Sequence, residues 1–287
     1  MSPTLIIVNP AARSEKAKAL FQKIEKLSSK TRIRMTSAPG EARDLAEAAA
    51  RQGCKRIVAA GGDGTVNEVV NGIAGCDVTL GVLPIGTMNV FASELGIPTG
   101  NLHKCWELIE KGTTRLVDLP SANSHKFVQL AGIGFDAQIV AATSFDSKKT
   151  FGPLSYVISA TQIAAQKPPR LVVESEEVSC EGSFVLVGNG RYYGGPFVIF
   201  KEARIDDGKL DVLVFKNLGY LDIVRYLQAI IFGTHTKLAD VEYFQTKKLS
   251  VRSEDRVPVE VDGEVIGEVP VTFRVAPGKL RVFAPPA

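Results

Sequence analysis

The regular alternation of strand and helix signals over the first 120 residues limits the fold more than any other feature of this sequence. Short apolar or β-branched runs predict strands, and apolar residues at helical spacing predict the helices between them. The predicted strands are Thr4–Val8, Thr31–Thr36, Arg56–Ala60 and Val78–Leu83, and the predicted helices are Arg13–Leu27, Glu41–Arg51, Thr65–Ile73, Met88–Leu95 and Leu102–Glu110. Repeated units of this kind favour a parallel sheet covered by helices on both faces.

After Asp118 the pattern changes to short strands separated by glycine-rich or acidic turns, which is typical of an antiparallel sandwich or barrel. The predicted strands are Phe127–Ile133, Leu171–Glu177, Ser183–Val187, Lys209–Phe215, Lys248–Arg252, Val257–Val261 and Val271–Val275, with helices near Pro153–Ala165 and Tyr220–Phe232. The polar stretch Ser121–Lys126 separates the two patterns. We therefore predict an α/β domain over residues 1–122 and an all-β domain over residues 123–287.

Length and charge limit the class of protein. A chain of 287 residues has room for two domains, and a net charge of +3 is too small to indicate a nucleic-acid partner. None of the four cysteines has C-x-x-C spacing, which favours free thiols in a reducing compartment. The sequence shows neither a signal peptide nor an apolar run long enough to span a membrane, so we expect a cytoplasmic protein.

The stretch VAAGGDGTVNEVVNG, from Val58 to Gly72, joins a predicted strand to a predicted helix through glycines. Glycine lets the main chain adopt positive φ or approach a ligand closely, and a helix N-terminus attracts anions. Asp63 is unexpected there, because two like charges 4 Å apart repel by about 4 kcal/mol at an effective dielectric constant near 20. A Mg²⁺ ion between the carboxylate and a nucleotide phosphate would remove the conflict. The alternative is a tight turn in which Asp63 only caps the helix.

This stretch, with Val8-Asn9-Pro10 before it and Leu83-Pro84-Ile85-Gly86-Thr87-Met88-Asn89 after it, resembles the diacylglycerol kinase catalytic domain. The resemblance is nearest to the soluble bacterial group of lipid kinases and covers nearly the whole chain. Further similar segments are Gly188–Gly195, Ile205–Leu210 and Val261–Glu264. It implies an NAD kinase-like α/β lobe, a C-terminal β-sandwich, and an active site in the cleft between them.

The resemblance also implies roles for individual residues. The expected ATP contacts are Asn9, Thr36, Gly61, Gly62, Asp63, Gly64, Thr65, Val66, Asn67 and Thr87. A structural Mg²⁺ ion would use the Asp207 carboxylate with the main-chain carbonyls of Arg204 and Lys209. Glu264 corresponds to the proton acceptor, and Asp262 would assist it by orienting the site or by binding metal.

Several of these residues also have plain structural interpretations. Asp262-Gly263 is a preferred pair for a type I′ hairpin turn, and Asp206-Asp207-Gly208 also fits a simple turn. Asp118 fits a strand end as well as a water-linked metal network, and His235 is expected to be an ordinary loop residue.

Two positions depart from the family pattern. Asn89 is followed by Val90 where many relatives have aspartate, which weakens any detailed metal assignment. The Asn9-Pro10 loop continues with Ala11-Ala12-Arg13-Ser14 rather than reaching a glycine, so Arg13 or Ser14 could supply phosphate contacts.

We therefore predict a lipid kinase that transfers the γ-phosphoryl group of ATP to a lipid hydroxyl, with Mg²⁺ as cofactor. Transient contact with the inner membrane surface would give it access to the lipid, and the sequence does not indicate an oligomeric state. An NAD kinase-like enzyme and a non-catalytic lipid- or nucleotide-binding protein on the same scaffold are the alternatives.

Overall fold

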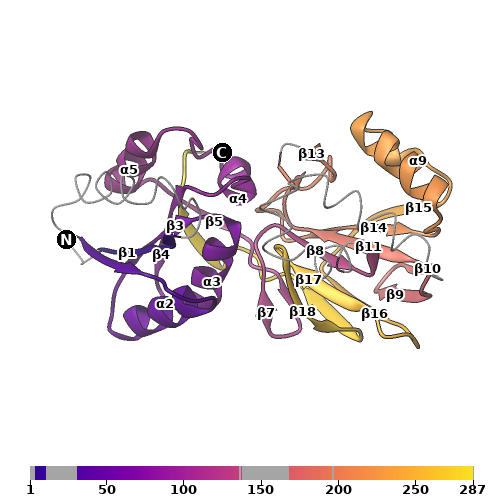
Figure 1. The fold of residues 1–287 in the computed structure, drawn as a ribbon, viewed down its shortest axis with the longest axis horizontal. Helices are drawn as coiled ribbons and strands as arrows, with labels where there is room; N and C mark the ends of the chain where they lie inside the picture. The colour runs from indigo at the N-terminus through magenta and orange to yellow at the C-terminus, as the bar shows by residue number, and fades with distance from the viewer. Residues whose placement is uncertain (1–3, 11–30, 136, 138–167, 196, 287) are drawn as a thin grey trace. The chain divides into compact units, whose positions relative to one another are not determined.

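A computed structural model describes residues 4–10, 31–135, 137, 168–195 and 197–286. The chain divides into two compact units, one of residues 1–119 together with 277–287, the other of residues 120–276 (Figure 1). The helices predicted at Arg13–Leu27 and Pro153–Ala165 lie outside the described residues.

The first unit is built on a six-stranded sheet with the order β2-β1-β3-β4-β20-β5. Its strands are β1 (Thr4–Val8), β2 (Arg32–Met35), β3 (Arg56–Gly61), β4 (Thr79–Pro84), β5 (Thr114–Val117) and β20 (Leu280–Phe283). The neighbours from β2 to β20 pair in parallel, and β5 pairs antiparallel with β20. The predicted parallel sheet is therefore confirmed.

Helices cover both faces of this sheet: Figure 1 shows α2 and α3 on one side and α5 on the other. They are α2 (Glu41–Arg51), α3 (Asp63–Ile73), α4 (Val90–Glu94) and α5 (Leu102–Lys111). Helix α2 packs tightly on α3, because a Cβ added at Gly72 would lie 2.4 Å from the Arg43 carbonyl oxygen. Burial from both sides explains why β1, β3 and β4 are almost continuously apolar.

The end of the chain returns to the first unit. Strand β20 lies between β4 and β5 in the first sheet (Figure 1). The division predicted from the sequence placed all of residues 123–287 in the second domain, so the arrangement of the last eleven residues differs from that prediction. A four-residue strand carries too little signal to reveal which sheet it joins.

The second unit contains two six-stranded antiparallel sheets with the orders β10-β9-β16-β19-β6-β7 and β15-β14-β11-β8-β17-β18. The strands of the first are β6 (Ser121–Ala122), β7 (His125–Lys126), β9 (Leu171–Ser175), β10 (Ser179–Gly182), β16 (Lys248–Arg252) and β19 (Val271–Arg274). The strands of the second are β8 (Leu130–Ile133), β11 (Phe184–Gly188), β14 (Leu210–Phe215), β15 (Val241–Thr246), β17 (Pro258–Val261) and β18 (Glu264–Glu268). A short pair, β12 (Tyr192–Tyr193) with β13 (Phe197–Val198), stands apart from both sheets.

The two sheets enclose one apolar core, so the predicted β-sandwich is confirmed. Strand β14 is buried at every position because each of its faces meets a different cluster. Leu210, Val212 and Val214 point into the sandwich, while Leu213 and Phe215 belong to a second cluster.

That second cluster lies under helix α9 (Tyr220–Ile231), which covers the outer face of the sheet and is followed by the short 3-10 helix η2 (His235–Lys237). His235 is fully buried and its Nε2 bonds to the Ile199 carbonyl oxygen at 2.7 Å, which gives it a structural contact. Among the described helices, none combines the length and the apolar character needed to cross a bilayer.

Candidate active site

Four segments of the first unit that we expected to contact ATP follow four neighbouring parallel strands. Asn9 follows β1, Thr36 follows β2, Gly61–Asn67 begins at the end of β3, and Thr87 follows β4. Because these strands are adjacent and parallel, their carboxyl ends lie along one edge of the sheet, where open α/β sheets bind their ligands. The structure thus brings the predicted nucleotide contacts to one edge.

Hydrogen bonds join three of these segments. The Asn9 side-chain amide donates to the Thr65 hydroxyl at 3.1 Å, and the Asn9 main-chain N–H donates to the Ala60 carbonyl at 2.9 Å. The Thr36 N–H donates to the Val8 carbonyl at 2.9 Å. The loops after β1, β2 and β3 therefore form one connected group.

The glycines of the turn serve close packing rather than unusual backbone angles. Glycine would allow positive φ at Gly61, Gly62 and Gly64, but none of the three adopts it, and Gly62 is extended with φ −91°. Space is limiting instead: a Cβ at Gly61 would lie 2.3 Å from the Thr65 hydroxyl oxygen, and one at Gly86 would lie 2.4 Å from the Gly62 Cα. The turn after β3 and the turn after β4 are in backbone contact, which only glycine permits.

Asp63 is the first residue of α3, and its side chain crosses to the next loop. Its Oδ1 accepts a hydrogen bond from the Phe91 N–H at 3.2 Å, within the first turn of α4. Asn89 holds that loop: it has φ 51°, and its side chain exchanges two 2.9 Å hydrogen bonds with the main chain of Gly86. Val90 is a buried residue of the same helix start.

The first turn of α3 offers main-chain groups rather than side chains to an anion. Val66 and Asn67 are buried, and the Asn67 side-chain oxygen accepts from the Asn71 amide at 3.0 Å. The N–H groups at 63–65 have no acceptor within the helix, as at every helix N-terminus. Thr87 is exposed in the loop beyond β4.

In the second unit, Asp262 and Gly263 form the two-residue turn of the hairpin β17–β18, with φ 47° and 86°. The predicted type I′ hairpin is confirmed, and it places Glu264 as the first, exposed residue of β18. Glu260, only 1% exposed, accepts the Gly263 N–H at 2.7 Å and so fixes the turn from inside. The sequence pattern gave no sign of this role, because Glu260 alternates with two valines, as an outward-facing residue would.

The Asp262 carboxylate binds the main chain of a distant segment. It accepts the N–H groups of Val128, Gln129 and Leu130 at 2.8, 3.0 and 3.1 Å, and the Asp262 N–H donates to the Leu130 carbonyl at 2.8 Å. Asn189, fully buried, donates its side-chain amide to the Val128 carbonyl at 3.0 Å. Asp262 therefore fastens the hairpin tip to the segment leading into β8, which favours a positioning role.

The Asp207 turn has oxygen ligands of the kind that Mg²⁺ binds. The Lys209 N–H donates to the Asp207 Oδ1 at 3.0 Å, and the Asp207 N–H donates to the Arg204 carbonyl at 3.4 Å. The Arg204 guanidinium lies 3.8 Å from Asp206, and the Lys209 ammonium reaches Gln245 at 3.3 Å. The two basic groups thus contact side chains other than Asp207, and a carboxylate with main-chain carbonyls is a donor set that fits a hard cation completed by water. Within the described residues, no cluster of three or more His, Cys, Asp or Glu side chains is placed to hold a metal.

Asp211, which sequence analysis did not single out, lies close to this turn. It is 1% exposed, and its Oδ1 accepts from the Tyr243 hydroxyl and from the Gln245 amide. Its Oδ2 is buried without a hydrogen bond among the described residues. Burial raises the pKa of the Asp211 carboxyl, and the neighbouring charge of Asp207 adds to the effect.

Asp118, near the end of the first unit, accepts the Gly278 N–H at 2.8 Å while being 1% exposed. This hydrogen bond holds the C-terminal segment that leads into β20. It supports the structural interpretation of Asp118, with Gly278 as the partner.

The first unit has a parallel sheet with helices on both faces and an aspartate in the glycine turn after β3. The second unit, which follows it in sequence, is an antiparallel sandwich. This combination is typical of a class of two-domain kinases. Residues 3–122 match the family model for the diacylglycerol kinase catalytic domain, and residues 130–284 match that for the YegS C-terminal NAD kinase beta sandwich-like domain. The chain belongs to the diacylglycerol kinase family of lipid kinases.

Individual relatives resemble the chain over almost its whole length. A diacylglycerol kinase of Bacillus subtilis is 29% identical, covering 95% of this chain and 93% of the relative. One from Staphylococcus saprophyticus is 31% identical over 98% and 94% of the two chains. The crystal structure of a diacylglycerol kinase from Bacillus anthracis has a TM-score of 0.80 at 26% identity, covering 99% of this chain and 98% of the other. The predicted resemblance and fold class are therefore confirmed.

Proposed function

We propose that this protein transfers the γ-phosphoryl group of ATP to a hydroxyl group of a membrane lipid such as a diacylglycerol. The observation that carries the proposal is the convergence of Asn9, Thr36 and the glycine turn at one edge of the parallel sheet, in a chain that belongs to the diacylglycerol kinase family. Kinases of this family imply a nucleotide donor.

The residues at this edge have complementary tasks in binding the nucleotide. The main-chain N–H groups at the start of α3 would bind phosphate oxygens, and Asn9, Thr36 and Thr87 would position the rest of the nucleotide. Gly61 and Gly62 let the turn pack against Thr65 and Gly86, and Gly64, which has no side chain, would let a phosphate approach the main chain at the start of α3. The buried Val66 and Asn67 anchor that helix.

Magnesium, when bound with the nucleotide, would neutralise phosphate charge during transfer. Asp63 is the residue of the first unit suited to face that charge, and its bond to the Phe91 N–H fixes the direction of its carboxylate. A second, structural ion would be held by the Asp207 carboxylate with the carbonyls of Arg204 and Lys209. Its part would be to stabilise the turn before β14.

Glu264 would accept the proton of the lipid hydroxyl. Its position directly after a two-residue turn is consistent with this role, because the turn is rigidly held by Glu260 and by the three hydrogen bonds to Asp262. Asp262 would act by positioning Glu264. We place the enzyme in the cytoplasm, in transient contact with the inner membrane surface, with no nucleic-acid partner.

The test is phosphoryl transfer from labelled Mg-ATP to diacylglycerol, to a fractionated lipid extract and to NAD, with the products identified. We expect a phosphorylated lipid and no phosphorylated NAD. Labelled NAD, or turnover of no acceptor, would contradict the proposal.

The matched pair of variants is Glu264→Gln and Glu268→Gln, two exposed glutamates on the same strand. Loss of a general base costs about 10²- to 10⁴-fold in kcat, so Glu264→Gln should lose turnover but still bind ATP. Glu268 pairs with Arg256 at 2.9 Å on the surface, and its variant should keep full activity. An active Glu264→Gln enzyme would exclude the assigned base.

A further inference from the structure

Helix α9 carries a stripe of large apolar side chains on its outer face. The exposed fractions are 58% for Tyr220, 79% for Leu221, 37% for Val224, 53% for Leu227, 68% for Ile231 and 78% for the following Phe232. Steps of three and four residues place Leu221, Val224, Leu227 and Ile231 on one side of the helix. We refer to these six residues as the α9 stripe.

The opposite face of α9 is apolar as well. Ile223 and Tyr226 are buried in the cluster that contains Phe184 and Phe215, and Ala229 on the same face is also buried. Tyr226 packs edge to face on Phe215, with ring centroids 4.9 Å apart. A helix that is apolar on both faces is ordinarily buried on both, so the exposed stripe indicates a partner of its own.

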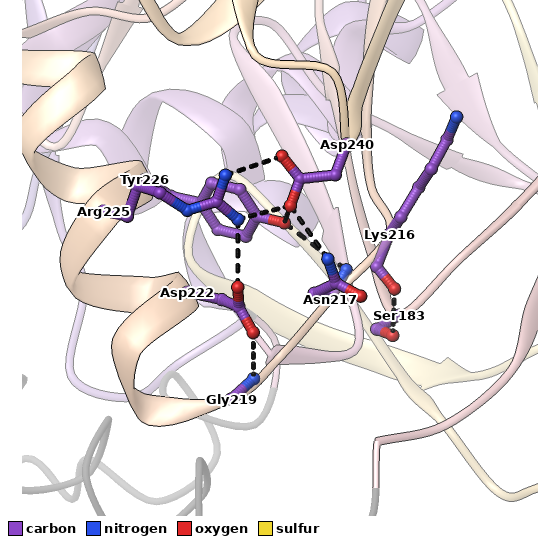
Figure 2. A network of polar contacts seen from close by, with 8 residues as sticks. All are labelled: Ser183, Lys216, Asn217, Gly219, Asp222, Arg225, Tyr226 and Asp240. Carbon is purple, nitrogen blue, oxygen red and sulfur yellow. Dashed lines mark hydrogen bonds and ion pairs between the residues drawn. The ribbon is translucent and has the colours of Figure 1, made fainter.

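A polar network fastens α9 to the unit without using the stripe (Figure 2). Asp222 accepts the Gly219 N–H at 3.1 Å and pairs with Arg225 at 2.9 Å, and Arg225 also pairs with Asp240. The Tyr226 hydroxyl donates to Asp240 at 2.7 Å. Asp222 and Arg225 are the charged residues of α9, so the helix has no net charge and its only acid is already paired with a cation.

A cation lies at the C-terminal end of the stripe, beside a shallow open groove of about 320 Å³. The groove is lined by Phe197, Val198, Lys201, Ile230, Ile231, Phe232 and Gly233. The Lys201 ammonium donates to the Gly233 carbonyl at 2.5 Å, and Phe197 beside it is 51% exposed. An anionic phospholipid surface has phosphate groups that attract an ammonium group and acyl chains that bury apolar side chains. Lys201 among exposed apolar side chains complements both.

We propose that the α9 stripe, with Phe197 and Lys201, docks this protein on the surface of a bilayer that contains anionic phospholipid. The inference rests on the proposed function, because a lipid acceptor lies in such a surface. The charges favour a bilayer over a second copy of the chain. A second α9 stripe would offer the Lys201 ammonium no unpaired acid, because Asp222, the only acid of α9, already pairs with Arg225, whereas an anionic phospholipid would offer its phosphate.

The experiment measures binding of the full-length protein, without ATP, to vesicles of phosphatidylcholine alone and of phosphatidylcholine with phosphatidylglycerol in equal parts. The double variant Leu221→Glu with Leu227→Glu places two negative charges on exposed positions of the stripe. Leu116→Glu is the matched control, since Leu116 is also 53% exposed but lies in the first unit. The milder variant Leu221→Ser is measured beside them in case the double variant fails to fold.

We expect the double variant to weaken binding to the mixed vesicles at least tenfold and Leu221→Ser to weaken it measurably, while Leu116→Glu binds like the wild type. Lys201→Gln should remove most of the preference for the anionic vesicles. Unchanged binding by both stripe variants would overturn the proposal. So would a wild-type dimer, seen by light scattering, that the double variant converts to a monomer while vesicle binding persists.

Activity on two forms of the acceptor separates this inference from the proposed function. Docking predicts that the double variant loses turnover of vesicle-bound diacylglycerol but keeps turnover of a short-chain diacylglycerol dissolved in water. If no lipid is phosphorylated by any form of the protein, while vesicle binding still depends on the stripe, the proposed function fails and the docking surface stands.

Discussion

The turn after β3 and the hairpin turn between β17 and β18 both place an aspartate beside glycine, and they use the same residue types for different purposes. In the turn after β3, the Asp63 carboxylate accepts one hydrogen bond from a described residue, the Phe91 N–H at 3.2 Å. In the hairpin turn between β17 and β18, the Asp262 carboxylate accepts three, at 2.8, 3.0 and 3.1 Å. The Asp262 carboxylate is therefore largely committed to the fold, whereas the ligand role that we propose for Asp63 requires a carboxylate with fewer bonds to the protein.

The glycines differ in the same way. Gly62 and Gly86 are needed because two main chains touch, whereas Gly263 has nothing within 4 Å of an added Cβ and is needed for its φ of 86°. The first turn requires glycine because a side chain would clash with the neighbouring main chain. The second turn requires glycine because of its positive φ. Four pairs of variants can test this contrast.

The largest effect is expected from Asp262. Charged hydrogen bonds contribute about 1.5–3 kcal/mol each, and buried donors left without an acceptor cost about 1–3 kcal/mol, so Asp262→Ala should lower the free energy of unfolding by about 3 kcal/mol or more. Asp262→Asn, which keeps one acceptor oxygen and suits a left-handed backbone, should lose about 2 kcal/mol. Urea titrations of both variants measure this. A loss below 1 kcal/mol for Asp262→Ala would remove the distinction between the turns.

Asp63 should show the opposite behaviour. Asp63→Asn keeps an oxygen for the Phe91 N–H, so the free energy of unfolding should change by less than about 1 kcal/mol. Loss of the negative charge should lower kcat/KM by about 100-fold, or about 2.7 kcal/mol of transition-state stabilisation. The matched control is Asp44→Asn, an exposed acid of the neighbouring helix α2, which should keep full activity. A stable Asp63→Asn enzyme with normal turnover would show that Asp63 serves only to hold the start of α4 through the Phe91 N–H.

These two aspartates also show how much of the structure could be predicted from the sequence. The glycine turn, its strand and its helix are local, so the order of elements around Asp63 could be predicted from residues close in sequence. The partners of Asp262 lie 132 to 134 residues away, and no local pattern indicates that three consecutive N–H groups will meet one carboxylate. Hydrogen bonds between residues so far apart leave no periodic pattern in the sequence, so they could not be predicted from it.

Two strands of the second unit contrast a successful strand prediction with a missed strand. Strand β14, apolar at five of its six positions and buried at all of them, was found almost to its limits. Strand β18 has exposed residues at four of its five positions and gave no apolar signal. Its existence follows from the hairpin turn before it, and that turn was predicted from Asp262-Gly263.

A third variant tests the requirement for room in the first turn. In Gly86→Ala the new Cβ would lie 2.4 Å from the Gly62 Cα, a main-chain atom that cannot move aside easily. Overpacking of this kind costs about 1–3 kcal/mol, and here it should also lower activity by displacing the Asp63 turn. Gly100→Ala is the control, because Gly100 has no atom within 4 Å of an added Cβ and no positive φ. Equal stability of the two variants would argue against backbone contact between the loops.

The smallest effect is expected at Gly263, where only the backbone angle is restrictive. Alanine at φ 86° should cost about 1 kcal/mol, because an added Cβ disfavours the left-handed region, while open space around the residue adds no clash. Gly263→Asn should cost less than Gly263→Ala, since asparagine adopts positive φ more readily. Thermal unfolding of the two variants gives the order. If alanine proved no worse than asparagine, the turn would owe its shape to Glu260 and Asp262 rather than to glycine, and the two glycine turns would differ less than their geometry indicates.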